Sequence, residues 1–218
     1  MQQIKKLEIT LKEKFLMKPM GDINHVLGKK VQRDRAMMTL MISQSAYAQT
    51  VLERFDMADC RQISTPIATG AVLEPNDGPA ALYQYQQAVG SLVYLAMGTR
   101  PNIAYGVGLV SRFASNPGEQ HVKAVKQLMC YIRNTVDMGI LFGGSDDDGF
   151  VGFVDADFAG CTTTRQSTSG SIFKRFGGAV CWASRRQECA TLSTTEAEYV
   201  ALCSTLREPC NQLSNLSA

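Results

Sequence analysis

The apolar run at residues 153–160, FVDADFAG, carries Asp155 and Asp157 at alternate positions. Alternate residues of a β-strand point to one face, so both carboxylates share one side of the expected strand. Burying an unpaired charge is costly, and this leaves two interpretations. Either both Asp are solvated at a sheet edge, or they belong to a metal site that needs a further carboxylate from elsewhere in the chain.

The composition of the 218-residue chain indicates a folded core. Its residues are 45% hydrophobic and 19% charged, which argues against global disorder. No apolar run is long enough to cross a membrane, and the charged N-terminus lacks the apolar centre of a secretory signal. Seven Cys without CxxC spacing are typical of a reduced intracellular protein without zinc, so we expect a cytoplasmic or nuclear location.

Positive charge is concentrated near the N-terminus. Residues 1–35 carry nine Lys or Arg against Glu8, Glu13, Asp22 and Asp34, a net charge of +5 in a chain whose total is +2. Such a segment can contact phosphate backbones. It can equally be one solvated helix face, and both interpretations stay open.

The N-terminal part predicts a helix, two strands and a second helix. Apolar residues at helical spacing predict an amphipathic helix over residues 2–16. Two short strands are expected about a polar turn at residues 33–35. Ser43 is expected to cap the next helix. The Pro- and Gly-containing segment from residue 60 to residue 82 predicts a surface loop and a domain boundary.

Three helices are predicted next, each with a buried stripe of apolar residues. Thr99 is expected to cap the second helix, with Pro101 in its first turn. Lys123 and Lys126 lie off the third stripe, where they form either a phosphate-facing edge or a solvated face. The stripes are Tyr85, Ala88, Val89, Leu92 and Ala96; Ile103, Val107, Val110 and Phe113; and Val122, Val125, Leu128, Met129 and Ile132.

The C-terminal third predicts three strands and then a helix, an order typical of the α+β class. Gly177 and Gly178 indicate a hairpin between the second and third strands. Ser193 or Thr194 is available as the N-cap of the helix. Glu196 falls in its first turn, where the helix dipole favours an anion. A capping role for Glu196 or Glu198 is the structural alternative to a metal-binding role.

Several longer motifs, in order along the chain, carry a family resemblance. They are ISQSAYAQTVLERFDM (42–57), AVGSLVYLAMGTRPNIAYGVGLVSRFASNPGEQH (88–121), FVDADFAG (153–160), RQSTSGSIF (165–173) and CWASRRQECATLSTTEAEYVAL (181–202). With them, the chain resembles the C-terminal part of the Pol polyprotein of copia-type retrotransposons over nearly its whole length.

The resemblance implies three segments. Residues 1–66 would be the thumb-like C-terminal end of a reverse transcriptase, and residues 67–145 a helical connection. Residues 146–218 would be the N-terminal part of a ribonuclease H-like domain. The expected α+β fold is therefore a helical thumb and connection followed by an incomplete ribonuclease H-like mixed sheet with a helix.

The resemblance also implies chemistry, namely cleavage of the RNA strand of an RNA–DNA hybrid with Mg²⁺ or Mn²⁺ held by carboxylates. Asp155 matches the family's first-strand Asp, and Glu196 matches the Glu that opens the first helix. Asp157 belongs to the motif, although its spacing alone does not make it a ligand. Hybrid recognition would rest on groove shape and 2′-hydroxyls.

Basic and hydroxyl residues are the expected contacts to the nucleic-acid backbone. Arg165, Ser167 and Thr168 lie in the family's strand-linking turn. Lys123 and Lys126 are further candidates. No membrane partner is expected, and the sequence does not indicate an oligomeric state.

The sequence departs from the family pattern at several points. The Tyr-Val-Asp-Asp motif of the polymerase does not occur, so polymerisation is not expected. The tail LREPCNQLSNLSA contains no Asp for a third carboxylate, and Pro209 is expected to interrupt the helix. Cys161 stands where the family has an acidic residue, and Ser171 where it has Tyr.

These departures predict a fragment or remnant that binds metal weakly and does not cleave RNA alone. A non-catalytic nucleic-acid-binding relic, or a nuclease completed by carboxylates from another chain, are the alternatives.

Overall fold

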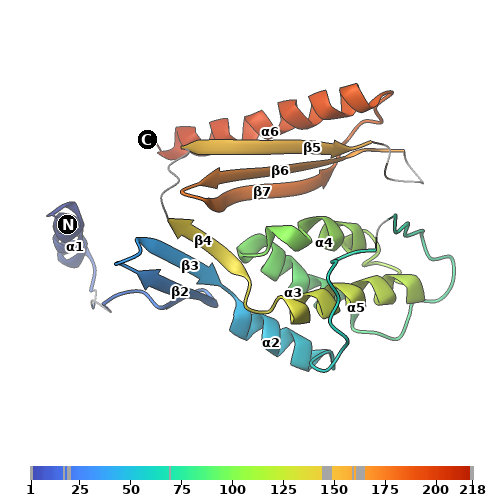
Figure 1. Ribbon diagram of the computed structural model, residues 1–218, viewed down its shortest axis with the longest axis horizontal. Coiled ribbons are helices and arrows are strands. Elements are labelled where there is room, and N and C mark those ends of the chain that lie inside the picture. Colours follow the sequence, from blue (N-terminus) through green and yellow to red (C-terminus); the bar gives the residue numbers. More distant parts are fainter. Residues whose placement is uncertain are drawn as a thin grey trace.

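The computed structural model describes residues 2–16, 18, 21–68, 70–143, 149–158, 160 and 165–216, with side chains described between residues 6 and 206. Six α-helices and two antiparallel sheets form an α+β fold in these ranges, which confirms the expected class (Figure 1). The departure from the family pattern at Cys161 lies outside the described residues.

The first sheet has the order β1-β2-β3-β4. Its strands are β1 (His25–Val26), β2 (Lys29–Asp34), β3 (Thr39–Ser43) and β4 (Gly139–Gly143). The β2–β3 turn is stabilised by Asp34 Oδ1, which accepts hydrogen bonds from the backbone N–H groups of Ala36 and Met37 at 2.9 and 3.0 Å.

Strand β4 was not predicted, and its pairing with β3 joins distant parts of the chain. Gly143 ends this strand with a φ of 104°, a region that favours glycine. A Cβ at this position would lie 2.1 Å from the carbonyl oxygen of Met38, so the close approach of the two strands requires glycine.

Helices α2–α5 pack into one hydrophobic core beside this sheet. The helical elements are α1 (Gln2–Lys14), α2 (Ser45–Arg54), α3 (Tyr85–Gly98), the 3₁₀ turn η1 (Pro101–Ile103), α4 (Ala104–Ser111) and α5 (Glu119–Asn134). The three predicted stripes are buried, except for the half-buried Phe113. None of the described helices combines the length and apolar character of a membrane span.

The core does not break at the expected boundary near residue 66. Side chains of α2, including Val51 and Leu52, share the core with α3–α5 on the far side of the loop. The described residues of the segment 60–82, which leave out residue 69, contain no helix or strand, as predicted. The division into a thumb-like segment and a connection therefore stays a prediction.

Two predicted helix caps are wrong because their hydroxyl groups lie elsewhere. Ser43 ends β3, and Gln44 stands at the N-cap of α2 without a side-chain capping bond. Thr99 follows α3, and its hydroxyl donates to Gln44 Oε1 at 2.9 Å. Pro101 begins η1, as predicted.

The second sheet has the order β5-β6-β7, with α6 along one face. Its elements are β5 (Phe150–Asp157), β6 (Thr168–Arg175), β7 (Gly178–Arg186) and α6 (Thr194–Leu216). Phe176 and Gly177 have φ values of 50° and 75°, as a type I′ hairpin requires. The predicted interruption at Pro209 is wrong, because α6 continues through it; a proline removes a single backbone donor from the helix.

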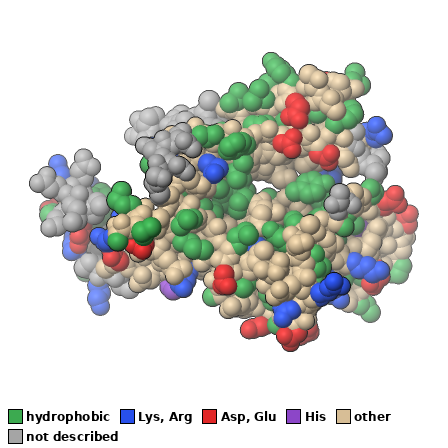
Figure 2. Space-filling view, in the orientation of Figure 1, with side chains coloured by type: hydrophobic (Ala, Val, Ile, Leu, Met, Phe, Trp, Pro, Cys, Tyr) green, Lys and Arg blue, Asp and Glu red, His purple; other side chains and the backbone are tan. Residues whose placement is uncertain are grey.

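The second sheet contacts helix α3 through β7, and it contacts the end of β4 through the turn between β6 and β7. The indole N–H of Trp182 donates to the carbonyl oxygen of Ala96 in α3 at 2.8 Å. The N–H of Gly143 donates to the carbonyl oxygen of Phe176 at 2.8 Å. Figure 2 shows hydrophobic side chains gathered between the upper and lower parts of the molecule in this view.

Candidate functional site

Asp155 lies on an exposed part of β5 and engages its own backbone. Its Oδ1 accepts a hydrogen bond from the N–H of Ala156 at 3.0 Å. Its side chain is exposed, which fits a solvated carboxylate, and its role as a metal ligand stays a prediction. The cost of burial that made two Asp on one strand problematic is therefore avoided.

Strand pairing assigns Asp155 to one face of the second sheet. Asp155 pairs with Gly170, which pairs with Ser184, and directly paired residues share a face. Trp182 lies two residues before Ser184 on the same face, and its indole reaches α3. Asp155 is therefore on the face that includes Trp182.

Helix α6 covers the opposite face. Gln187 Nε2 donates to Ser169 Oγ at 2.9 Å and to the carbonyl oxygen of Ala197 in α6 at 2.8 Å. Ser169 is the neighbour of Gly170, so it points away from the face of Asp155. Ala197 and Ala201 are fully buried against the sheet on this side.

Glu196 takes part in the start of α6. Ser193 Oγ accepts a hydrogen bond from the N–H of Glu196 at 3.1 Å, which confirms Ser193 as a cap. Glu196 Oε2 in turn accepts a hydrogen bond from the N–H of Leu192 at 2.7 Å. This reciprocal arrangement is close to a capping box. Glu198 follows as an exposed carboxylate on the same helix.

Asp155 and Glu196 come from elements that meet at one end of the sheet. Strand β5 ends, and α6 begins, at the same side of the view in Figure 1. The register nevertheless places Asp155 on the face away from α6. Within the described ranges, no three His, Cys, Asp or Glu side chains gather into a group that could hold a metal ion. Because Mg²⁺ requires about six oxygen ligands, these residues alone do not form a fitting site.

Asp157 faces the helical layer rather than α6. Burial raises the pKa of Tyr105 in α4, the charge of Asp157 raises it further, and Arg112 lowers it. Asp157 also packs against Gly160, where an added Cβ would lie 2.1 Å from its Oδ2. Sequence reasoning missed Tyr105 and Arg112, because no local pattern links α4 to the end of β5.

The candidate nucleic-acid contacts differ in accessibility. Arg165 is exposed, with a φ of 54°. Ser167 is fully buried, with its hydroxyl 2.9 Å from that of Thr191, and Thr168 is buried too. The predicted contacts of Ser167 and Thr168 with a nucleic-acid backbone are therefore wrong for this structure, because both side chains are buried.

The predicted cations of α5 are exposed. Lys123 is exposed, and Lys126 Nζ lies 5.6 Å from the ring centroid of Tyr83. Part of the basic N-terminal charge is paired, since Arg35 donates to both carboxylate oxygens of Asp22 at 2.9 and 3.0 Å. These exposed cations stay candidates for phosphate contacts.

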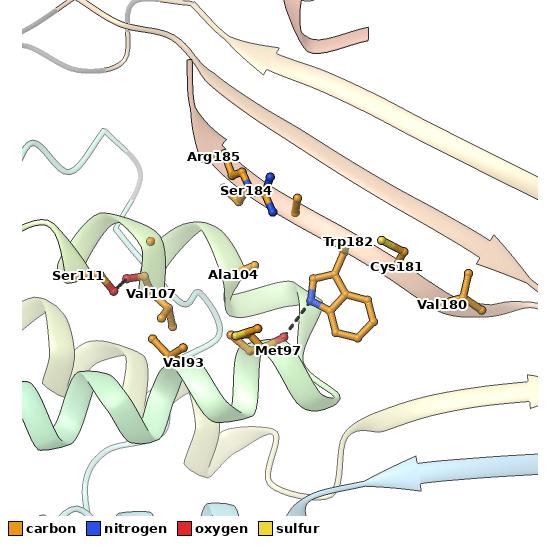
Figure 3. A pocket seen from close by; sticks show the side chains of 13 residues that line it. Val93, Met97, Ala104, Val107, Ser111, Val180, Cys181, Trp182, Ser184 and Arg185 are labelled. Atoms are coloured by element: carbon orange, nitrogen blue, oxygen red, sulfur yellow. Dashed lines mark hydrogen bonds between the residues drawn. The ribbon is translucent and has the colours of Figure 1, made fainter. Parts of the chain in front are cut away.

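A hollow of about 530 Å³ lies between β7 and helices α3 and α4 (Figure 3). Its lining is mainly aliphatic and includes Trp182, Met97 and Val107. The hydroxyl of Ser111 is engaged by the carbonyl oxygen of Val107 at 2.6 Å. The hollow therefore marks where the two parts pack and offers no acid–base pair.

The chain is similar to a transposon polyprotein and to two proteins with other names. It is 42% identical over 213 residues to the retrovirus-related Pol polyprotein from transposon TNT 1-94 of Nicotiana tabacum, covering 94% of this chain and 16% of that protein. It is 43% identical over 124 residues to the secreted RxLR effector protein 161 of Plasmopara viticola, covering 57% of this chain and 87% of that protein. An uncharacterized mitochondrial protein of Arabidopsis thaliana is 32% identical to this chain over 208 residues. The match covers 91% of this chain and 82% of that protein.

No family model and no solved structure matches the chain. The chain spans about one sixth of the tobacco polyprotein, and the similarity runs through both sheets. The expected resemblance is confirmed: the chain belongs to the family of retrovirus-related Pol polyproteins of copia-type retrotransposons.

Proposed function

We propose that this chain is a section of a retrotransposon Pol polyprotein with a ribonuclease H-like sheet. It binds an RNA–DNA hybrid but does not cleave the RNA strand on its own. The observation that carries this proposal is the arrangement of β5, β6, β7 and α6 in a chain of this family. Asp155 lies in the first strand, and Glu196 lies in the first turn of the following helix.

Exposed cations support binding through the phosphate backbone. Lys6, Lys12 and Lys14 are exposed on α1, Lys123 and Lys126 on α5, and Arg165 before β6. Contacts of this kind are independent of base sequence and weaken with salt. Discrimination of the hybrid would come from the shape of its groove and its 2′-hydroxyls.

The carboxylates support the non-catalytic part of the proposal. The family resemblance assigns Mg²⁺ or Mn²⁺ to Asp155 and Glu196, but Asp155 lies on the face away from α6, and each carboxylate already has one oxygen engaged by a backbone N–H group. A single carboxylate would leave most of the coordination shell to water, so metal binding at either residue would be weak. These two carboxylates alone do not complete a catalytic site.

Hydrolysis of an RNA–DNA hybrid by the isolated chain tests the proposal. We expect no measurable turnover with Mg²⁺ or Mn²⁺, together with binding that weakens as salt rises. Asp155→Asn and Glu196→Gln are the test variants, and Glu198→Gln is the matched control on the same helix. Turnover abolished by Asp155→Asn would show a working nuclease. Turnover that appears only at high protein concentration would show that a second chain completes the site.

Charge substitutions locate the binding surface. Deleting residues 1–35 would remove β1 and β2 with the cations, so Lys6, Lys12 and Lys14 should be changed to Gln instead. We expect the slope of log affinity against log salt to become shallower by about 0.9 for each phosphate group that the protein no longer neutralises. The pair Lys123→Gln and Lys126→Gln is the comparison set. Unchanged affinity and slope in both sets would contradict hybrid binding by these surfaces.

A further inference from the structure

Two cysteines from distant parts of the sequence meet in the helical core. Cys130 lies in α5 and is 9% exposed, whereas Cys60 lies in the loop after α2 and is half-buried. Cys130 belongs to the hydrophobic cluster of the helical core and Cys60 packs against the same cluster, close enough to raise the pKa of Cys130. Both are free thiols in this structure.

The segment that carries Cys60 is fixed against α5 by its neighbours. Arg133 lies three residues after Cys130 and donates to the carbonyl oxygen of Cys60. Its Nη2 is 3.9 Å from Asp59 Oδ1. The N–H of Cys60 donates to the carbonyl oxygen of Met57 at 3.3 Å. A disulfide needs Cβ atoms about 3.5–4.5 Å apart, and the anchoring of the Cys60 carbonyl one helical turn from Cys130 brings the two residues together from distant parts of the sequence.

We propose that Cys60 and Cys130 are a redox-active pair that closes to an intramolecular disulfide when the protein meets a peroxide. The disulfide would tie the loop after α2 to the middle of α5. It involves no residue assigned to nucleic-acid binding, so it does not depend on the proposed function.

The reaction with hydrogen peroxide is balanced as two steps. The Cys60 thiolate attacks one peroxide oxygen, the O–O bond breaks, and the products are a sulfenic acid on Cys60 and one water once protons are transferred. The sulfur of Cys130 then attacks the Cys60 sulfur, the S–O bond breaks, and a second water leaves. Two thiols are oxidised to one disulfide, and one peroxide is reduced to two waters.

The environment of the pair assigns the order of these steps. Burial and the contact with Cys60 raise the pKa of Cys130 to about 11, while the charge of Arg133 opposes this rise. Cys130 is therefore mainly a thiol at neutral pH and a poor first nucleophile. Cys60, which is more exposed, reacts first, and Cys130 resolves the sulfenic acid. The closing rate should rise with pH.

The test uses the full chain treated with hydrogen peroxide and analysed by non-reducing peptide mass spectrometry. We expect a Cys60–Cys130 linked peptide in the monomer, with the loss of two hydrogen atoms. Dithiothreitol should reverse it. The oxidised chain should have a Tm higher by roughly 5–10 °C. Cys60→Ser and Cys130→Ser should each abolish the linked peptide.

The exposed Cys189 and Cys203 provide the matched controls. Cys189→Ser and Cys203→Ser should leave both the linked peptide and its Tm shift unchanged. Three outcomes would overturn the proposal: both thiols still free after peroxide has oxidised Cys189, Cys60 over-oxidised without a link, or links between chains only. Peptide mapping of the peroxide-treated chain without substitutions shows whether the Cys60–Cys130 link forms, even where a variant does not fold.

Discussion

The helical part and the second sheet solve the problem of burial differently. Helices α2–α5 enclose a core in which side chains such as Leu92, Leu128 and Ile132 have no exposed surface. In the second sheet and α6, the buried apolar side chains of the described residues are Phe173, Ala197 and Ala201. Large apolar side chains stay exposed there, including Phe153 at 55% and Tyr199 at 67%.

The helical part therefore contributes most of the stability, whereas the second sheet carries the residues of the candidate site. Buried apolar surface stabilises by roughly 25 cal/mol per Å², so most of the folding free energy belongs to the helical part. The second sheet contributes less burial and carries the exposed carboxylates and Arg165. Regions with few buried contacts open more readily than a core. We therefore expect the second sheet to exchange its amides faster than helices α3–α5.

The largest expected effect is the loss of a core side chain in the helical part. Leu128→Ala removes a fully buried side chain from α5 and should lower the free energy of unfolding by about 2–5 kcal/mol. Phe153→Ala in β5 is the control, and its effect should stay within about 0.5 kcal/mol because the ring is exposed. Urea unfolding measures both. Equal costs would contradict the contrast between the two regions.

The helical part should also respond to pH through His121. This residue is fully buried, its Nδ1 accepts a hydrogen bond from the N–H of Gly118 at 2.8 Å, and Nε2 donates to the carbonyl oxygen of Glu74 at 2.9 Å. Burial lowers its pKa below the ordinary 6.5, against the opposing effect of Glu74. Protonation of Nδ1 would break the Gly118 bond and bury a charge.

Proton uptake by the unfolded chain decides whether stability rises or falls with pH. Between the lowered pKa and 6.5, the unfolded chain binds more protons, so stability is complete above 6.5 and is lost as pH falls. Urea unfolding across this range should show the loss, and His121→Gln should remove part of the slope. The exposed His25 gives the control His25→Gln. An unchanged slope in His121→Gln would contradict this role.

Sequence patterns predicted local structure well and long-range contacts poorly. The three stripes of α3–α5 were found because helical spacing alone decides which residues share a side. Strand β4 was missed because GILFG gains its structure from Thr39–Ser43, far away in the chain. The hydroxyl groups of Ser43 and Thr99 fit local capping rules, but a tertiary bond from Thr99 to Gln44 overrides the rule.

The candidate site shows the same limit. Period-two alternation correctly puts Asp155 and Asp157 on one face, but it does not say which face α6 covers. That depends on Gln187, which joins Ser169 to Ala197 across the sheet and helix. The cap at Ser193 was predictable, because Ser followed by Glu three residues later is a local signal.

A smaller effect is expected at the junction of the two regions. Trp182→Phe keeps the aromatic packing but leaves the carbonyl oxygen of Ala96 without its indole donor (Figure 3). The expected cost is about 1 kcal/mol. Amide exchange should increase in β7 and at the end of α3. Tyr199→Phe, on the exposed side of α6, is the control and should leave exchange unchanged. Equal exchange in both variants would show that the bond does not hold the regions together.

The smallest effect separates the two possible roles of Glu196. As a cap, its exposed carboxylate accepts a hydrogen bond from Leu192, so Glu196→Ala should cost about 0.5 kcal/mol and increase exchange in the first turn of α6. Glu196→Gln keeps an oxygen acceptor and should cost less, whereas Glu198→Ala should be nearly neutral because that side chain is exposed. Titration with Mn²⁺ then distinguishes the second role. If Glu196→Gln keeps its stability but loses weak Mn²⁺ binding, the same carboxylate starts the helix and holds the metal. If Mn²⁺ binding is unchanged in Glu196→Gln, the residue is a cap only, and the metal-binding role proposed for it is wrong.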